Sequence, residues 1–142
     1  MQKYPEKDDT EYIRTLFQKD TFAVETTGAR VEKAGPGYAL CSLRVDERHR
    51  NIRGDVMGGV IFTLADFAFG AAANTGDSGS VSLSSNINFL RGTKGPVLYA
   101  EAKCVKRGRN IGFYDVTVTD GEDRIIATAS INGFVKHGGS AD

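Results

Sequence analysis

The chain has 142 residues, which is the size of one domain and is enough to bury a hydrophobic core. Its 18 Lys and Arg residues balance its 18 Asp and Glu residues, so there is no overall charge to attract nucleic acid or an anionic membrane. We therefore expect a single domain over residues 1–142, with a core over residues 10–136, flexible termini, and neither nucleic acid nor a membrane as a partner.

The two cysteines and the first nine residues indicate the cellular compartment of the protein. Cys41 and Cys104 lie in strand-like segments without CxxC spacing, which argues against a zinc site or a disulfide framework. Residues 1–9 are polar and of mixed charge, so they lack the apolar core of a secretory signal. We expect reduced cysteines, no metal and a cytoplasmic protein.

The first third of the chain predicts one helix and one hairpin. Residues 9–19 carry apolar side chains at helical spacing behind an acidic start, which predicts a short amphipathic helix. Residues 22–34 are typical of an extended segment, and the turn signal at 35–37 leads into a second strand over 38–45. The polar residues 46–56 then predict a loop that places side chains at the start of the next element.

Residues 57–73 form the one long helix-compatible run. Apolar side chains occupy every face of this predicted helix, so we expect it to be buried, and the run is short for a membrane span. Asp66 is its only charge. Because an ionised carboxylate is costly to bury without a partner, the structure must either satisfy Asp66 or use it.

A turn over residues 74–79 follows, and residues 81–89 then alternate as a strand. The face expected in the core carries Val81, Leu83, Ile87 and Phe89, and the other face carries Ser82, Ser84, Asn86 and Asn88. After a loop over 91–96, three more strands are predicted over 97–106, 111–119 and 125–135, joined by hairpin turns at 107–110 and 120–123. The last strand is expected to place Ile125, Ala127, Ala129, Ile131 and Val135 on one face. The pattern predicts an α+β fold in which about six mostly antiparallel strands wrap one buried helix.

Gly58 and Gly59 lie at the start of the predicted helix. The first N–H groups of a helix have no intrahelical partner and carry the positive end of its dipole, and a ligand can approach a glycine backbone closely. This is a site for an anion or a developing oxyanion. The alternative is that the two glycines only allow close packing against the sheet.

Asp66 lies eight residues beyond Gly58, or about 12 Å along a helix. The two groups can act on one bond only if a second copy runs antiparallel, so that Asp66 of one chain faces the Gly58 end of the other. A shared active site therefore implies a homodimer. The alternative is an Asp66 that bonds local donors and has no catalytic role.

Weaker candidates surround these two. Ser82, Ser84 and Asn86 offer donors to a carboxylate or a water, although such a row is more often a solvated sheet face. Cationic side chains suited to phosphates lie in two loops, namely Arg91, Lys94, Lys106, Arg107 and Arg109. His49 and His137 are the only histidines, and neither has a spaced partner for a metal. The chain has no nucleophile-elbow, Walker-type or GxGxxG motif.

Two stretches together carry a family resemblance. These stretches resemble the hotdog-fold acyl-CoA thioesterases of the phenylacetate-degradation (PaaI-like) group. The first runs from His49 to Asp66 and contains Asn51, Gly54, Met57-Gly58-Gly59 and Leu64-Ala65-Asp66, and the second runs from Val81 to Arg91. The resemblance covers roughly residues 10–136. It implies a hotdog fold, a homodimer or a dimer of dimers (a homotetramer), and hydrolysis of an acyl-CoA thioester at a subunit interface, with coenzyme A as part of the substrate and no cofactor.

The resemblance also implies roles for single residues. It makes Asp66 the base or nucleophile, and it makes the Gly58 amide the group that polarises the thioester carbonyl. It implies that Asn51 positions the water or carbonyl and that Ser82 supports the Asp66 of the partner subunit. Gly59, Met57, Phe62, Ser84 and Asn86 are expected to contact the substrate, and Arg91, Lys106, Arg107 and Arg109 to contact the phosphates of coenzyme A.

Met57 departs from the family, which has a histidine before the two glycines. Its soft apolar side chain replaces a ring that forms hydrogen bonds, while the Gly58 N–H is unaffected. Phe62, Phe69 and the apolar strand faces are compatible with an aromatic or a medium-chain acyl group. The alternatives are a non-catalytic acyl-CoA binding or sensing protein, which Met57 favours, and a hotdog hydratase, for which neither histidine is well placed.

Overall fold

The computed structural model describes residues 5–76 and 79–137. The predicted flexibility of the termini concerns residues 1–4 and 138–142, and part of the predicted turn concerns residues 77–78, all of which lie outside the described residues. The helices are α1 (Thr10–Phe17), the π-helix η1 (Phe22–Thr27), the 3₁₀-helix η2 (Glu47–His49) and α2 (Gly58–Ala73). The strands are β1 (Ala29–Gly35), β2 (Tyr38–Arg44), β3 (Gly79–Phe89), β4 (Val97–Arg107), β5 (Ile111–Asp120) and β6 (Ile125–Lys136).

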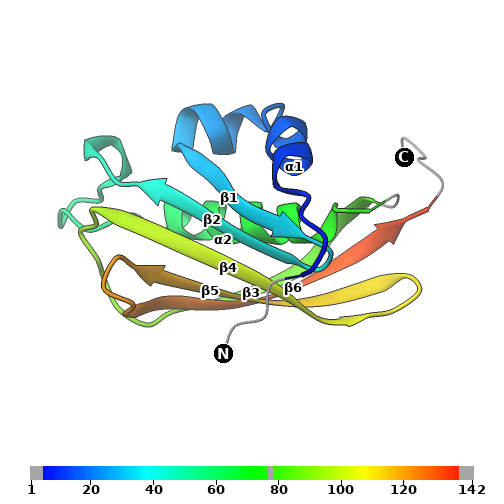
Figure 1. Ribbon diagram of the computed structural model, residues 1–142. Coiled ribbons are helices and arrows are strands. Elements are labelled where there is room, and N and C mark those ends of the chain that lie inside the picture. The colour runs from blue at the N-terminus through cyan, green and yellow to red at the C-terminus, as the bar shows by residue number, and fades with distance from the viewer. Residues whose placement is uncertain (1–4, 77–78, 138–142) are drawn as a thin grey trace.

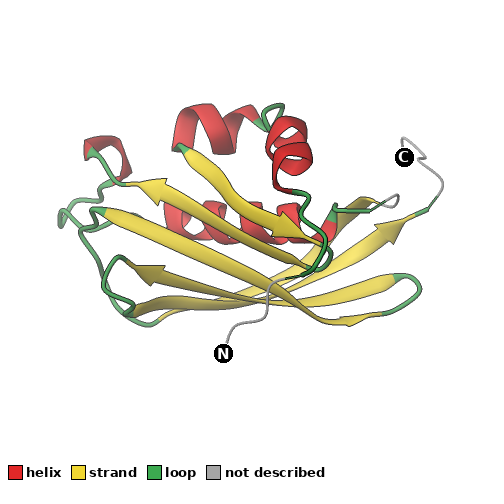
Figure 2. Cartoon of the chain, viewed as in Figure 1, coloured by secondary structure: helices red, strands yellow, loops and turns green. Residues whose placement is uncertain are grey.

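The strands form one sheet in the order β1-β2-β4-β5-β6-β3, and every neighbouring pair is antiparallel. The sheet is curved, α2 lies along one of its faces, and α1 and η1 lie near the β1 edge (Figures 1 and 2). β3 forms the opposite edge, so its outer backbone groups face no strand of the described chain. The predicted α+β arrangement of six strands, one long helix and one short N-terminal helix is confirmed.

The core lies between α2 and the sheet. Leu64, Ala65 and Ala68 of α2 are fully buried, and the alanines let the helix backbone approach the strands closely. Phe69 packs edge-on against Tyr114 of β5, with ring centroids 5.2 Å apart. Phe17 packs in the same way against Phe67, at 5.6 Å, which fixes α1 on the helix.

Residues 22–34 are not one extended segment as predicted. Residues 22–27 instead form the π-helix η1, and only residues 29–35 form a strand. η1 ends at Thr27 and is capped by Gly28, whose φ of 93° is a left-handed conformation that favours glycine. The β-branched residues of this stretch are typical of a strand. Tertiary packing decides the helical turn instead, and local residue preferences do not report that packing.

The predicted faces of β3 are also wrong in part. A β-bulge at Leu83 shifts the register against β6 between Ser82 and Ser84. Ser82 pairs with the buried Gly133 and therefore faces α2, whereas Ser84 pairs with Asn132 on the other face. Val81 joins the face away from α2, because its partner is the exposed Phe134.

The start of β6 differs from the prediction for a similar reason. A register irregularity against β5 puts Ile126 in the core, where it is fully buried. Ile125, which was expected to share a face with Ala127 and Ile131, is 49% exposed. Among the described residues, no helix is long and apolar enough to cross a membrane.

Candidate active site at the start of α2

The start of α2 presents two unbonded N–H groups. Met57 is the N-cap residue, and its carbonyl accepts the N–H groups of Val60 at 3.0 Å and Ile61 at 3.3 Å. Among the described residues, the N–H groups of Gly58 and Gly59 have no acceptor, and no side chain caps the helix. The dipole of the 16-residue helix adds to the positive potential at this point. This end of α2 can therefore bind an anion or a developing oxyanion.

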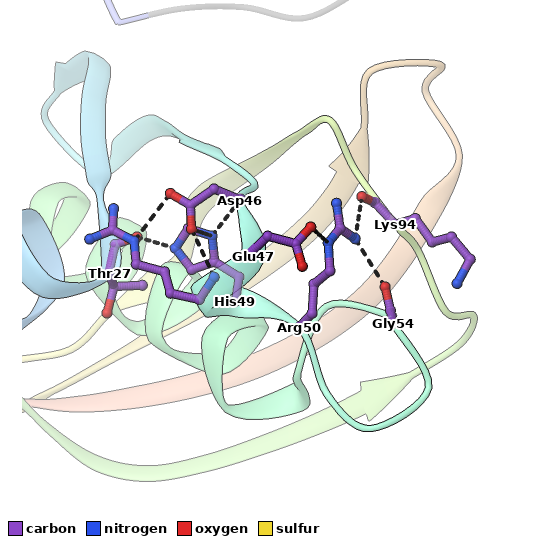
Figure 3. Close-up of polar contacts among 8 residues, drawn as sticks. Thr27, Asp46, Glu47, His49, Arg50, Gly54 and Lys94 are labelled. Carbon is purple, nitrogen blue, oxygen red and sulfur yellow. Dashed lines mark hydrogen bonds and ion pairs between the residues drawn. The ribbon is translucent and has the colours of Figure 1, made fainter.

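The loop that leads into α2 is held by its own polar groups. Asn51 Oδ1 accepts the backbone N–H groups of Arg53 at 2.9 Å and Asp55 at 3.1 Å. Arg50 Nη1 donates to the carbonyls of Gly54 at 2.9 Å and Lys94 at 3.0 Å, which joins this loop to the one after β3 (Figure 3). The amide oxygen of Asn51 is thus used by the loop, and its Nδ2 is the group that is left to meet a ligand.

Two apolar side chains flank the Gly58 and Gly59 amides. The Phe89 ring, at the end of β3, lies so close to Gly58 that a Cβ there would be 3.3 Å from it. The Met57 methyl lies beside Gly59, at 3.5 Å from the equivalent point. Both side chains are about half exposed, so they present apolar surface beside the amides. Phe89 was expected in the core, and no local signal places it beside Gly58.

Asp66 lies on the one face of α2 that the sheet does not cover. Gly59, Thr63 and Asp66 follow one another at intervals of four and three residues, and none of them is fully buried. The expectation that the helix is buried on all sides is therefore wrong for the isolated chain. Among the described residues, Asp66 has neither a hydrogen-bond partner nor an ion pair. Partial burial and then the nearby charge of Asp20 raise the pKa of Asp66 above its ordinary value.

The other predicted residues are spread over the chain. Ser82 faces α2 but does not hydrogen-bond to Asp66 of its own chain among the described residues. Ser84 and Asn86 lie on the sheet face away from α2, and Ser84 Oγ accepts a hydrogen bond from Asn132 at 3.3 Å. Phe62 is half-buried on α2. Within one chain, Ser84 and Asn86 are therefore not brought to the Gly58 amides.

The predicted cations divide between the two ends of α2. Arg91 follows Phe89 and its backbone N–H bonds the Ile126 carbonyl, so it lies at the Gly58 end. Lys106, Arg107 and Arg109 lie in the β4–β5 hairpin, at the other end of the sheet. This end is marked by Gly133, which pairs with Gly112 of the hairpin and contacts Phe69 of α2. Among the described residues, no group of three or more His, Cys, Asp or Glu side chains could hold a metal ion.

Comparison with known proteins identifies the family. The thioesterase superfamily matches residues 53–127, which include Gly58, Gly59 and Asp66. A putative esterase of Archaeoglobus fulgidus is 30% identical over 120 residues, which are 84% of this chain and 78% of that protein. The chain belongs to the thioesterase superfamily.

Two further members agree with this assignment. The acyl-coenzyme A thioesterase PaaI of Escherichia coli is 28% identical over 113 residues, which are 79% of this chain and 80% of that protein. Its structure superimposes with a TM-score of 0.85 at 22% identity over 93% of this chain and 96% of that one, which shows a common fold. A hypothetical thioesterase of Streptococcus pneumoniae, solved with coenzyme A, has a TM-score of 0.78 and 28% identity over 84% of this chain and 96% of that one. These findings confirm the predicted PaaI-like family and its hotdog fold.

Proposed function

We propose that this thioesterase-superfamily protein hydrolyses acyl-CoA thioesters in a site shared between two copies of the chain. One observation carries the proposal. The unbonded amides of Gly58 and Gly59 and the unpaired carboxylate of Asp66 lie on the same helix, yet about 12 Å apart along it. Two copies that place their α2 helices antiparallel bring each Asp66 to the other's amides. The name of E. coli PaaI and the coenzyme A of the S. pneumoniae structure support this substrate class.

The surface around β3 supports such a pairing. β3 is an 11-residue edge strand, and exposed edges of this length invite pairing with another strand. Leu83, Phe89 and Leu90 are each more than half exposed along this edge and the loop after it. A second copy that adds its own β3 would extend the sheet and bury these side chains. The same contact would cover the open face of α2.

The chemistry needs two groups at the thioester carbon. The Gly58 N–H donates to the carbonyl oxygen and stabilises the negative charge that develops there. Asp66 of the partner subunit either removes a proton from an attacking water or attacks the carbonyl carbon itself, after which water cleaves the resulting anhydride. In both cases the C–S bond breaks, the thiolate of coenzyme A takes up a proton, and the acyl group leaves as a carboxylic acid.

The surroundings suggest how the substrate lies. Phe62, Phe89 and Met57 supply apolar contacts for an aromatic or medium-chain acyl group. Phe69 lies eleven residues beyond Gly58, about 16 Å along the helix, so the nearby β4–β5 hairpin approaches the Gly58 end of an antiparallel partner. Lys106, Arg107 and Arg109 of one chain are therefore proposed to meet the phosphates of a coenzyme A bound at the partner's amides.

Substitutions at Gly58 test the oxyanion site. Gly58 is the first helical residue, where proline is tolerated, and Met57 has a ψ of 138°, which suits a residue before proline. Gly58→Pro removes the N–H, whereas Gly58→Ala adds a comparable Cβ beside Phe89 and keeps it. We expect Gly58→Pro to lower kcat about 100-fold or more relative to Gly58→Ala, measured as release of free coenzyme A from a panel of acyl-CoAs. Equal rates in the two variants would remove the Gly58 amide from the mechanism.

A second candidate is acyl-CoA binding without turnover. Met57 favours it, because its half-exposed side chain supplies no hydrogen bond at the amides. Calorimetry on the wild-type protein distinguishes the two. Tight binding of an acyl-CoA with no release of coenzyme A supports the binding protein, and turnover that depends on Asp66 supports the enzyme.

A further inference from the structure

His49 is a buried side chain whose two ring nitrogens are both hydrogen-bonded. It is 2% exposed, although it belongs to the polar segment 46–56 that was predicted as a loop. Nδ1 accepts the backbone N–H of Asp46 at 2.9 Å, so the proton of the neutral ring lies on Nε2, which donates to the Thr27 carbonyl at 2.6 Å (Figure 3). Asp46 Oδ1 in turn accepts the Arg48 N–H at 3.0 Å, which closes a capping box around η2.

The backbone of His49 holds the residue that begins α2. The His49 carbonyl accepts the Met57 N–H at 2.8 Å. Met57 is the N-cap, and the peptide planes that follow it carry the N–H groups of Gly58 and Gly59. The ring fixes the backbone of His49, and the carbonyl then fixes the Met57 peptide. The direction of the two amides therefore depends on the His49 ring through two consecutive hydrogen bonds.

The third contact of His49 joins this end of α2 to η1. Thr27 is the last residue of η1 and is followed by the turn at Gly28. The Thr27 carbonyl accepts the hydrogen bond from the His49 ring. η1 packs against α2 and follows Asp20, the residue whose charge acts on Asp66. The segment beside Asp66 and the segment that carries the amides are thus connected through one imidazole ring.

From these contacts we infer that His49 is a positioning residue for the Gly58 and Gly59 amides, an inference that rests on the proposed function. It touches no substrate. Among the described residues, its ring is the one side chain that bonds both Asp46 and Thr27. A shift of the helix start of about 1 Å is enough to lower a rate by roughly 100-fold. Loss of the ring's hydrogen bonds should therefore lower kcat more than it lowers substrate binding.

Three variants test this role. His49→Phe keeps a flat ring but loses both hydrogen bonds, while His49→Gln offers one acceptor and one donor on a side chain of similar reach. Arg14→Met is the matched control, because Arg14 also bonds a backbone carbonyl, that of Val31 at 2.9 and 2.6 Å, but in α1, remote from the amides. Each variant is measured for Tm, for kcat and KM with acyl-CoA, and for the amide NMR shifts of Gly58 and Gly59.

We expect His49→Phe to lower kcat 10- to 100-fold, to leave KM within about threefold, and to move the Gly58 and Gly59 amide resonances. His49→Gln should recover most of kcat, and Arg14→Met should lower Tm without changing kcat. The inference is overturned if His49→Phe loses no more kcat than Arg14→Met, or if the glycine resonances do not move. If His49→Phe does not fold, His49→Asn takes its place, because its shorter side chain cannot bond both Asp46 and Thr27, and it is judged by the same two readouts. The NMR readout does not need turnover, so a wild-type protein without thioesterase activity would refute the proposed function and leave the positioning role testable.

Discussion

The loop before α2 and the strand after it differ in how their polar groups are satisfied. In residues 46–57, the side chains of His49, Arg50 and Asn51 bond backbone groups of the same chain and fix the start of the helix. In β3, by contrast, one edge pairs with β6 and the other edge has no partner in the described chain. Asp66 on α2, which lies on the face left open, has none either.

This difference separates what one chain completes from what it leaves for a second copy. The oxyanion half of the proposed site is preorganised, because its supporting hydrogen bonds are all internal. The carboxylate half is incomplete, because Asp66 is partly buried and has no partner among the described residues. Its pKa is therefore raised, and its ionisation costs free energy. A dimer would bring the two halves together.

Hybrid dimers give the sharpest test of this division. Asp66→Asn and Gly58→Pro should each lower the rate of coenzyme A release about 100-fold or more as homodimers. Co-expressed with different affinity tags and purified through both, they form hybrids in which one of the two sites has both groups intact. We expect such a hybrid to recover about half of the wild-type rate per dimer. A hybrid as inactive as its parents would show that each site is built within one chain.

A cation on the open face of α2 should separate the two copies. Thr63 is half-buried there, and its Oγ1 donates to the Gly59 carbonyl of its own helix, at 2.8 Å. Thr63→Arg should give a monomer in sedimentation velocity and should lower activity by about 100-fold, since charged groups facing each other across a two-fold axis repel. Ser130→Arg on the other sheet face is the control and should stay dimeric. An active, dimeric Thr63→Arg protein would place the interface elsewhere.

Restoring a histidine at the N-cap of α2 should have a smaller effect. Met57 lies beside the two amides and donates no hydrogen bond. Met57→His adds a donor, and one hydrogen bond of about 1 kcal/mol corresponds to roughly a fivefold rate change. We expect kcat to rise about three- to tenfold, with Met57→Leu unchanged as the control. A fall in kcat for Met57→His would mean that the apolar side chain itself serves the substrate.

The smallest expected effect is on stability. Because the pKa of Asp66 is raised in the folded chain, its ionisation disfavours folding, and this cost is absent below the ordinary Asp pKa and complete above the raised one. Asp66→Asn should therefore have the higher Tm at pH 7 and the same Tm as wild type near pH 3. The measurement is calorimetry across this range. A lower Tm for Asp66→Asn at pH 7 would mean that a partner group stabilises the carboxylate in the dimer.

Side-chain pattern and spacing predicted most of the fold. The helix-compatible run over residues 57–73 predicted α2, and the turn signals predicted all three hairpins. The wrong predictions concern positions where strand register or tertiary packing decides the conformation or the face of a residue. A two-residue alternation has no information about the bulge at Leu83, and residues 22–27 follow a helical path that their strand-like composition does not indicate.

The candidate site divides in the same way. Sequence alone singled out Gly58, Gly59 and Asp66, because glycines at a helix start and a lone charge in an apolar helix are visible in the order of residues. It did not predict the contact of Phe89 with Gly58, the use of Asn51 by its own loop, or the burial of His49. These contacts join residues far apart in the chain or depend on side-chain direction.

The sequence by itself determined which groups have chemistry to offer, since an unpaired amide and an isolated carboxylate follow from residue type and helical geometry. Only the tertiary structure decided how the amides are held. The hydrogen bonds that hold them join His49 to Thr27, Asp46 and Met57, at 2.6 to 2.9 Å. These bonds form only once η1, β1 and β2 have packed against the start of α2, because a hydrogen bond requires this close approach.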